Sequence, residues 1–324
     1  MTYIKQFYVN DLKEGMEFVD FFMAKGPALK VGANKKVYFD ITLADKTGSV
    51  SGKKWDVSPD ESGILETIAE GDLVKIRANV VSYKDIKQLR ITRIRKATEE
   101  DELSVKDYIK AAPESPESMY EYLWNTTEAM KDEELKRLCQ LVLDSNKEKL
   151  HYYPAAAKNH HAEFAGLLYH LKRMVMHGIV LCDIYTFLNK DLLIAGVLLH
   201  DMEKLTEIEA NRMGISTGYS FEGNMLGHLV QGVKRVDRWA EEIGIGHEKS
   251  IMLQHMMISH HYEPEFGSPK KPLFPEAEAL HYLDMMDAKM YDFEEAISGT
   301  EPGQFSDRVW TLDNRRIYKS TERE

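Results

Sequence analysis

The sequence predicts a multidomain protein in which a small N-terminal β-barrel precedes an all-α domain. Between Val37 and Ile94, apolar and polar residues alternate through short segments, as in strands with one buried face. From Ala162 onward, apolar residues recur with the period of a helix. Residues 1–96 carry a net charge of +4, whereas residues 97–324 carry −15. The basic first segment is therefore the better candidate for binding a polyanion.

Composition excludes several classes of protein. The chain has 324 residues, of which 43% are apolar, and this excludes a disordered polymer. The longest apolar run, Leu192–Leu199, is far shorter than the ~20 residues that span a bilayer, so we expect no membrane segment. The first residues lack the apolar stretch of a secretory signal. With only Cys139 and Cys182 available, a disulfide scaffold and a cysteine zinc site are excluded, and we expect a cytoplasmic protein.

The barrel is expected at residues 1–96. Turns at Asp45–Gly48 and Tyr83–Asp85 would join neighbouring strands, and a helical pattern at Pro59–Ala69 interrupts the series. Five strands with one helical insertion predict an OB-fold, a barrel whose face binds oligonucleotides. By periodicity alone, an SH3-like barrel fits nearly as well.

Beyond the barrel, residues 97–150 read as an acidic helical linker, in which Pro113 and Pro116 mark a helix start. Residues 151–324 form the predicted all-α domain. Its C-terminal extension contains a candidate hairpin around residues 310–318.

All twelve histidines fall between His151 and His281, and histidine is the commonest metal ligand in proteins. His200 and Asp201 end an apolar helical run, where burying an imidazole and a carboxylate costs free energy unless they bind something. Separate helices can bring such groups to one point. Nitrogen and oxygen donors together suit Mn, Fe, Co, Ni or Zn rather than Ca. The candidate ligands are His170, His200, Asp201, His228, His260, His261 and Asp284.

Simpler interpretations compete with the metal site. A single buried histidine is more often a hydrogen-bonded core residue than a ligand. Asp284 and Asp287 could form a solvated helix face, and His260-His261 could cap a helix C-terminus. The ordered set as a whole favours the metal, because all of these coincidences would have to occur together.

The order His170, His200-Asp201, Asp284 resembles the H…HD…D pattern of the HD-domain metal-dependent phosphohydrolases, and Lys204 fits its HDxxK extension. With the N-terminal barrel, nearly the whole chain resembles the YhaM-type 3′→5′ exoribonucleases. Glu203 departs from the glycine common in HDxGK. The matching strings are KNHH at 158–161, GLLYH at 166–170, SHH at 259–261, GSPK at 267–270 and LDMMDAKM at 283–290.

The resemblance implies an HD phosphohydrolase domain at 151–324 that hydrolyses single-stranded RNA, with single-stranded DNA as a second substrate, to nucleoside 5′-monophosphates. It implies one or two divalent ions, with Mn²⁺ expected first and Co²⁺, Fe²⁺, Ni²⁺, Zn²⁺ and Mg²⁺ as alternatives. Asp201, His200 and Lys204 are the expected catalytic residues. We assign His170, His200 and Asp284 to one ion, His228, His260 and His261 to the other, and Asp201 as the bridge because a carboxylate has two oxygens to share.

Substrate contacts are expected in both domains. Ser268 and Lys270 could hold the terminal phosphate, with a lid turn as the alternative, and His161 could reach the substrate or form a structural hydrogen bond. In the barrel, aromatic residues among cations are typical of base stacking, although Tyr38 and Trp55 could instead fill the core. The barrel candidates are Lys36, Trp55, Tyr83 and Lys87.

Two other functions stay open: an HD phosphohydrolase acting on a nucleotide or cyclic dinucleotide, and a non-catalytic nucleic-acid-binding accessory protein. The sequence also leaves open whether the chain forms a homo-oligomer and whether His255 is a ligand, a partner of a ligand or a packed neighbour.

Overall fold

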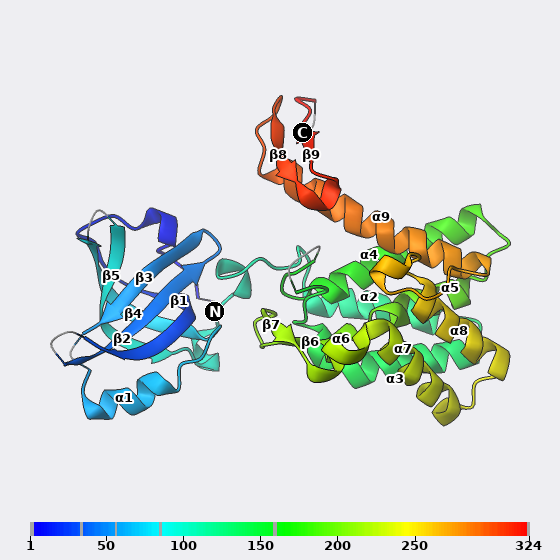
Figure 1. Ribbon diagram of the computed structural model, residues 1–324, viewed down its shortest axis with the longest axis horizontal. Coiled ribbons are helices and arrows are strands. Elements are labelled where there is room, and N and C mark those ends of the chain that lie inside the picture. Colours follow the sequence, from blue (N-terminus) through cyan, green and yellow to red (C-terminus); the bar gives the residue numbers. More distant parts are fainter. Residues whose placement is uncertain (1–2, 33–34, 56, 84–85, 158–160, 323–324) are drawn as a thin grey trace. The chain divides into compact units, whose positions relative to one another are not determined.

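The computed structural model describes residues 3–32, 35–55, 57–83, 86–157 and 161–322 (Figure 1). The chain forms two compact units, Met1–Ala111 and Ala112–Glu324. Each unit has its own hydrophobic core.

The first unit is a closed barrel. Its described strands are β1 (Glu17–Val31), β2 (Val37–Asp45), β3 (Gly48–Lys54), β4 (Leu73–Tyr83) and β5 (Ile86–Lys96), with helix α1 (Pro59–Glu66) between β3 and β4 (Figure 1). The strand order is β1-β2-β3-β5-β4, and β1 also pairs with β4. β3 and β5 are parallel, whereas the other pairs are antiparallel. This five-stranded barrel confirms the predicted OB-fold.

Alternating burial builds the barrel core. Phe22, Ile41, Ile76 and Leu89 point inward and are at most 2% exposed. The predicted turn after β2 is present, where the Thr47 N–H and hydroxyl donate to Asp45 at 2.8 and 2.6 Å. In the other predicted turn, residues 84–85 lie outside the described residues.

The predicted linker at 97–150 is wrong, because the structure divides this segment between the units. Residues up to 111, including η2 (Glu99–Asp101) and η3 (Val105–Asp107), belong to the barrel unit. Helices α2 (Pro116–Glu128) and α3 (Glu133–Leu150) belong to the second unit and bury apolar faces in its core. The acidic composition concealed the amphipathic faces of these two helices.

The second unit is a helical bundle built around one buried helix. α5 (Lys190–His200) has no exposed residue after Lys190, and α3, α4, α7, α8 and α9 all contact it. The remaining helices are α4 (Gly166–Ile184), α6 (Lys204–Glu207), α7 (Phe221–Ile243), α8 (His247–Ser259) and α9 (Pro275–Ser298).

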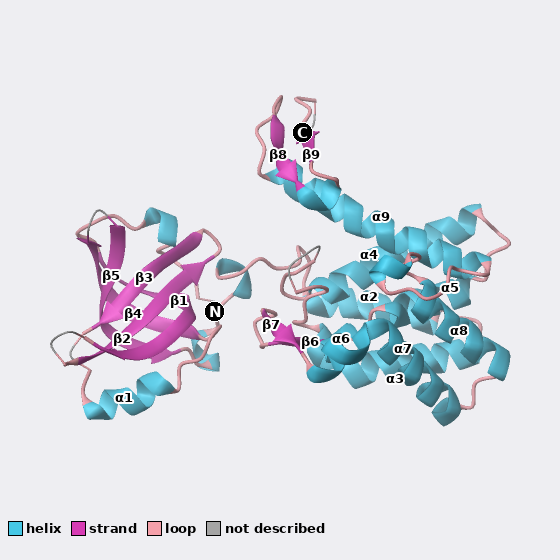
Figure 2. Cartoon of the chain, viewed as in Figure 1, coloured by secondary structure: helices cyan, strands magenta, loops and turns pink. Residues whose placement is uncertain are grey.

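Strands also occur in this second unit (Figure 2). The predicted C-terminal hairpin is present as β8 (Phe305–Val309) and β9 (Arg315–Tyr318), which are antiparallel. A short ribbon of β6 (Ile208–Ala210) and β7 (Ser216–Tyr219) was not predicted, so the unit is not entirely α-helical before its C-terminal extension. Among the described residues, no helix is both long enough and apolar enough to cross a membrane.

Glycine determines the helix geometry at two places near the site. At Gly196 of α5, an added Cβ would lie 2.0 Å from Cε of Met256 on α8, so glycine permits the close approach of these helices. Gly227 has φ +66° and ψ 166°, and it forms a kink inside α7. The first feature brings the end of α8 to the end of α5, and the second sets the position of His228.

Candidate metal centre

The histidines and acids of interest lie where helices meet. His200 is the last residue of α5 and Asp201 follows it. His260 follows α8 directly, while His228 comes directly after the kink in α7. His170 and Asp284 lie within α4 and α9, which are in contact. The bundle therefore gathers residues that are far apart in sequence.

Hydrogen bonds orient each of the expected histidine ligands. In every case Nδ1 has an acceptor, which leaves Nε2 as the atom that carries a lone pair. Two of the acceptors are carboxylates, Glu207 for His228 at 2.8 Å and Asp287 for His170 at 2.7 Å. The other three are backbone carbonyls at 2.8 Å, Val197 for His200, Met257 for His260 and Phe266 for His261.

Asp201 lies between the two sets of imidazoles. Its Oδ2 is 3.6 Å from Nε2 of His170 and 3.4 Å from Nε2 of His200. Its Oδ1 is 3.5 Å from Nε2 of His228. Asp284 Oδ1 is 3.4 Å from His170 Nε2 and 4.0 Å from His200 Nε2. The Asp201 carboxylate therefore faces His170 and His200 with one oxygen and His228 with the other.

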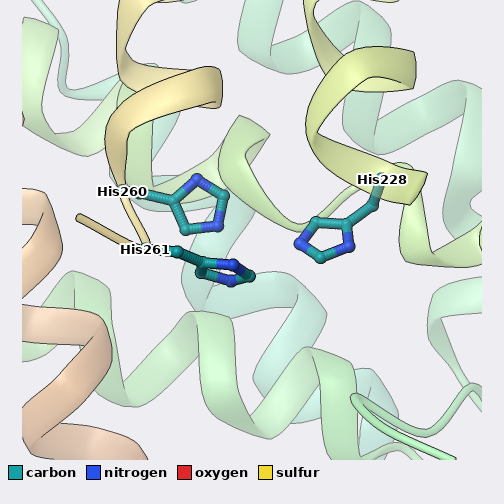
Figure 3. A group of neighbouring side chains, drawn as sticks. All are labelled: His228, His260 and His261. Atoms are coloured by element: carbon teal, nitrogen blue, oxygen red, sulfur yellow. The ribbon is translucent and has the colours of Figure 1, made fainter. Parts of the chain in front are cut away.

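The ligand atoms form compact groups that could each hold an ion. His228, His260 and His261 form one such group, with ligand atoms within 4.8 Å of one another, and their rings lie together in Figure 3. Among the described residues, His170, His200 and Asp201 form a second group, and His200, His260 and Asp284 form a third. The structure thus brings together all seven predicted ligands.

Whether these residues fit a metal can be tested on their buried nitrogen atoms that lack a hydrogen-bond partner. The Nε2 atoms of His200, His228 and His260 are buried and have no hydrogen-bond partner within the described parts of the chain. Each such atom costs about 1–3 kcal/mol if nothing binds it. Imidazole nitrogen and carboxylate oxygen at this spacing fit a divalent transition-metal ion.

The charges also suit a cation. Burial raises the pKa of Asp201, but Lys204 and His200 lower it more, so the pKa lies well below its ordinary value. Burial likewise raises the pKa of Asp284, but His170 and His200 lower it more, so this pKa also lies well below its ordinary value. Burial, together with neighbouring histidines, holds the pKa of His260 well below its usual range. The site thus offers ionised carboxylates and a neutral imidazole, which are the forms that bind metals.

Lys204 is not an ordinary surface lysine. Its Nζ is 2.6 Å from Asp201 Oδ2, and its side chain is only 11% exposed. Burial lowers its pKa, but Asp201 and Asp284 raise it above its usual value, so the ammonium stays charged beside the centre. Glu203 does not face solvent, because it is buried and accepts a hydrogen bond from Arg235 Nε at 3.1 Å.

Asp287 is a residue of the centre that the sequence analysis did not select. It is fully buried, so the solvated helix face considered for it is wrong. Its Oδ2 accepts from His170 Nδ1 at 2.7 Å and from His161 Nε2 at 2.9 Å, while Arg173 Nε lies 2.7 Å from Oδ1. Burial lowers the pKa of His170, but its contacts with Asp284 and Asp287 raise it to about 9, and a metal ion would displace the proton. The sequence did hold one signal for Asp287: it follows Asp284 by three positions, which places both on one face of a helix.

For two other residues near the centre, the contacts favour one of the alternatives left open by the sequence. The substrate contact predicted for His161 is not supported, because the ring is 0% exposed between Asp287 and Tyr291. His255 lies outside the ligand groups of the described residues. Its Nε2 accepts from the Leu273 N–H at 3.1 Å, so it supports the segment before α9.

Glu207 was also missed. Its Oε2 accepts from His228 Nδ1 at 2.8 Å, and its Oε1 accepts from the His228 backbone N–H at 3.2 Å. No spacing in the sequence linked these residues, which are 21 positions apart.

The GSPK segment follows η4 (Pro264–Phe266). Ser268 is 1% exposed, and its hydroxyl has no hydrogen-bond partner among the residues described. Lys270 is exposed. The structure thus supplies one unpaired donor in this segment, the Ser268 hydroxyl.

In the barrel, Trp55 lies outside the core and is 43% exposed. Half-buried Tyr38 stacks on it, with ring centroids 4.7 Å apart, and Lys53 Nζ lies 5.3 and 5.7 Å from the two rings. Lys36 and Lys87 are exposed. The side chain of Tyr83 lies outside the described part of the structure. The core alternative is therefore wrong for Trp55 and Tyr38.

The model of the HD domain family matches residues 167–289, which include all seven candidate ligands, so the helical unit is an HD domain. Over 299 residues the chain is 38% identical to the 3′-5′ exoribonuclease YhaM of Geobacillus sp. (strain WCH70), an alignment that covers 92% of this chain and 90% of the relative. The chain belongs to the YhaM family of 3′-5′ exoribonucleases.

Solved structures resemble part of the chain at low identity. The OB domain of Ta0387 from Thermoplasma acidophilum is 14% identical, with a TM-score of 0.23, and the match covers 28% of this chain and 86% of that domain. A small single-stranded DNA-binding protein from Streptomyces coelicolor is 12% identical, with a TM-score of 0.22, covering 27% and 98%. The assignment of the barrel as an OB-fold rests on its strand order and not on these matches.

Proposed function

We propose that the chain is a metal-dependent nuclease that removes nucleotides from the 3′ end of single-stranded RNA and releases nucleoside 5′-monophosphates. The observation that carries this proposal is Asp201, whose Oδ2 faces the oriented imidazoles of His170 and His200 and whose Oδ1 faces that of His228. The family relationship supports the direction and the RNA substrate. We propose that the enzyme acts in the cytoplasm, where single-stranded RNA is available.

Two divalent ions would be held by His170, His200 and Asp284 on one side and by a histidine trio on the other, with Asp201 shared. Bound ions of this kind activate water at neutral pH and neutralise charge on the phosphoryl oxygens. Mn²⁺ is the ion that the family resemblance leads us to expect first, while the mixed nitrogen and oxygen donors also suit Fe²⁺, Co²⁺, Ni²⁺ and Zn²⁺. The trio is His228, His260 and His261.

The protein's own groups position the reacting phosphate. Lys204 carries a positive charge beside Asp201 and would contact a non-bridging phosphate oxygen. The buried hydroxyl of Ser268 would donate to the terminal nucleotide, and Lys270 would act as a point charge for its phosphate. His161 acts through Asp287, which holds His170 in place.

The barrel would hold the rest of the strand. The stacked pair Tyr38 and Trp55 offers an aromatic face to bases, with Lys53 beside it. Lys36 and Lys87 add charge for the backbone, so binding would tolerate many sequences.

The test uses single-stranded RNA labelled at its 5′ end, with Mn²⁺. We expect a ladder of labelled fragments that are shortened from the 3′ end, together with release of nucleoside 5′-monophosphates. Both products should be absent when EDTA is added. Hydrolysis of nucleotides or cyclic dinucleotides without RNA cleavage would favour a different phosphohydrolase. Retention of RNA in a gel without products would favour a binding protein and contradict the proposal.

A further inference from the structure

A small basic pocket lies on α7 beside the metal centre. It is lined by Glu203, Gln231, Lys234, Arg235 and Arg238 and has a volume of about 60 Å³. None of these residues belongs to the ligand groups among the described residues. The centre as described above therefore makes no use of this pocket.

The pocket extends from the centre along one helix. Gln231, Arg235 and Arg238 follow His228 by three, seven and ten positions, which places them on one side of α7. At a rise of 1.5 Å per residue, Arg235 lies about 10 Å along the helix from His228. Glu203 is two residues from Asp201. A strand entering the centre can therefore pass the pocket.

Gln231 points to a missing ligand. The residue is only 7% exposed, and its Nε2 is buried without a hydrogen-bond partner in the described part of the protein. An amide NH₂ is a donor, so its absent partner is an acceptor. Leaving this donor unpaired is costly, and a ligand with oxygen acceptors would remove that cost.

The charges specify the sign of that ligand. Arg235 Nε donates to Glu203 at 3.1 Å, so the one acid of the pocket is already neutralised. Lys234 and Arg238 are exposed, and neither pairs with an acid among the residues that the structure describes. The pocket is thus positively charged, although residues 97–324 as a whole carry a net charge of −15. The pocket therefore attracts an anion.

We propose that this pocket binds a backbone phosphate of the RNA strand whose 3′ end occupies the metal centre. The inference rests on the function proposed above and adds a second point of contact to it. Gln231 would donate to a phosphate oxygen, while Lys234 and Arg238 would neutralise its charge. The cavity is small and polar, which suits a phosphate rather than a base.

The test measures RNA binding without turnover. Fluorescent 12-nucleotide RNA is titrated with the full chain in EDTA at several KCl concentrations, and anisotropy gives Kd. In Lys234→Ala/Arg238→Ala, the slope of log Kd against log salt should fall by about 0.7 for the lost phosphate contact. Gln231→Leu should raise Kd by about fivefold, the usual effect of one hydrogen bond. Lys131→Ala/Arg137→Ala removes two exposed cations near the start of α3 as a control and should change neither quantity.

The proposal is overturned if Lys234→Ala/Arg238→Ala binds RNA with the wild-type Kd and slope. It is also overturned if the pocket variants lose affinity for inorganic phosphate but bind RNA as the wild type does, because the pocket would then hold a free anion. Wild-type chain is assayed with Mn²⁺ in parallel. Absence of a ladder there refutes the nuclease function, while the binding slopes still decide on the pocket.

Discussion

The histidines of the centre share one design at the level of single residues. Each has Nδ1 fixed by an acceptor, so each presents Nε2 inward without a search among tautomers. Partners of this kind commonly change metal affinity by about 10–100-fold when removed. The acceptors therefore contribute to the metal affinity of the site.

Asp201→Asn tests the shared carboxylate. The substitution removes the negative charge that both ions would share. Several kcal/mol of transition-state stabilisation should therefore be lost. We expect kcat on RNA to fall by about a thousandfold or more, with RNA affinity near that of the wild type. Asp183→Asn, at an exposed position on α4, is the control. Equal loss of binding and turnover would show that the centre supplies most of the RNA affinity.

Asp287→Asn tests a positioning residue. The amide weakens the bonds to His170 and His161, so the dissociation constant for Mn²⁺ should rise by about 10–100-fold. Calorimetric titration measures this change, and saturating Mn²⁺ should restore most of kcat. Glu278→Gln on the same helix is the control. An unchanged Mn²⁺ affinity would remove Asp287 from this role.

At the scale of elements, two irregularities of helix packing shape the centre. Close contact at Gly196 sets α8 against α5, and the rings of His200 and His260 lie 5.0 Å apart at the ends of these helices. The kink at Gly227 sets the direction of the α7 segment that carries His228 and the basic pocket.

Gly227→Ala tests the kink. Its φ and ψ lie in a region that only glycine adopts readily, so the substitution should destabilise the fold by about 1–3 kcal/mol. It should also weaken Mn²⁺ binding through His228. Gly232→Ala on the same helix is the matched control, because an added Cβ there meets Met257 at an ordinary 3.5 Å. Urea unfolding compares the variants, and equal stability would mean that the kink tolerates a side chain.

Trp55→Ala tests the aromatic surface of the barrel. Loss of one stacking face should weaken RNA binding by about 1–3 kcal/mol. Anisotropy measures the change, and the turnover number at saturating RNA should stay near that of the wild type. Trp310→Ala removes a second exposed indole, 68% exposed and in the C-terminal hairpin segment, as a control. If both variants bind alike, the barrel surface is not the binding site.

At the scale of the molecule, the division at residues 111 and 112 predicts separable roles. A chain of residues 112–324 keeps the helical core and the complete metal centre. It should bind Mn²⁺ as the full chain does, need more RNA for half-maximal rate, and show a flatter salt dependence because barrel phosphate contacts are absent. Steady-state kinetics at several salt concentrations would measure this. Full affinity and slope in the truncated chain would contradict the role of the barrel.

Predictability from the sequence followed the range of the interactions. Strands β2 to β5, the C-terminal hairpin and the ligand order could be predicted, because alternation and spacing are local signals, whereas β1 lies before the segment in which strands were expected. The linker was misplaced because an acidic composition conceals whether a helix face is buried. Asp287 was undervalued because its partners His161 and His170 are 126 and 117 positions away.

By itself, the sequence determined the barrel, the helical domain and the set of candidate metal ligands, because residue type and short-range period carry that information. Only the tertiary structure decided which imidazole nitrogen faces inward, how Asp201 divides its oxygens and where Gln231 lacks an acceptor. These features depend on contacts between distant segments, and the physical reason is that burial and hydrogen-bond partners exist only once the helices have packed.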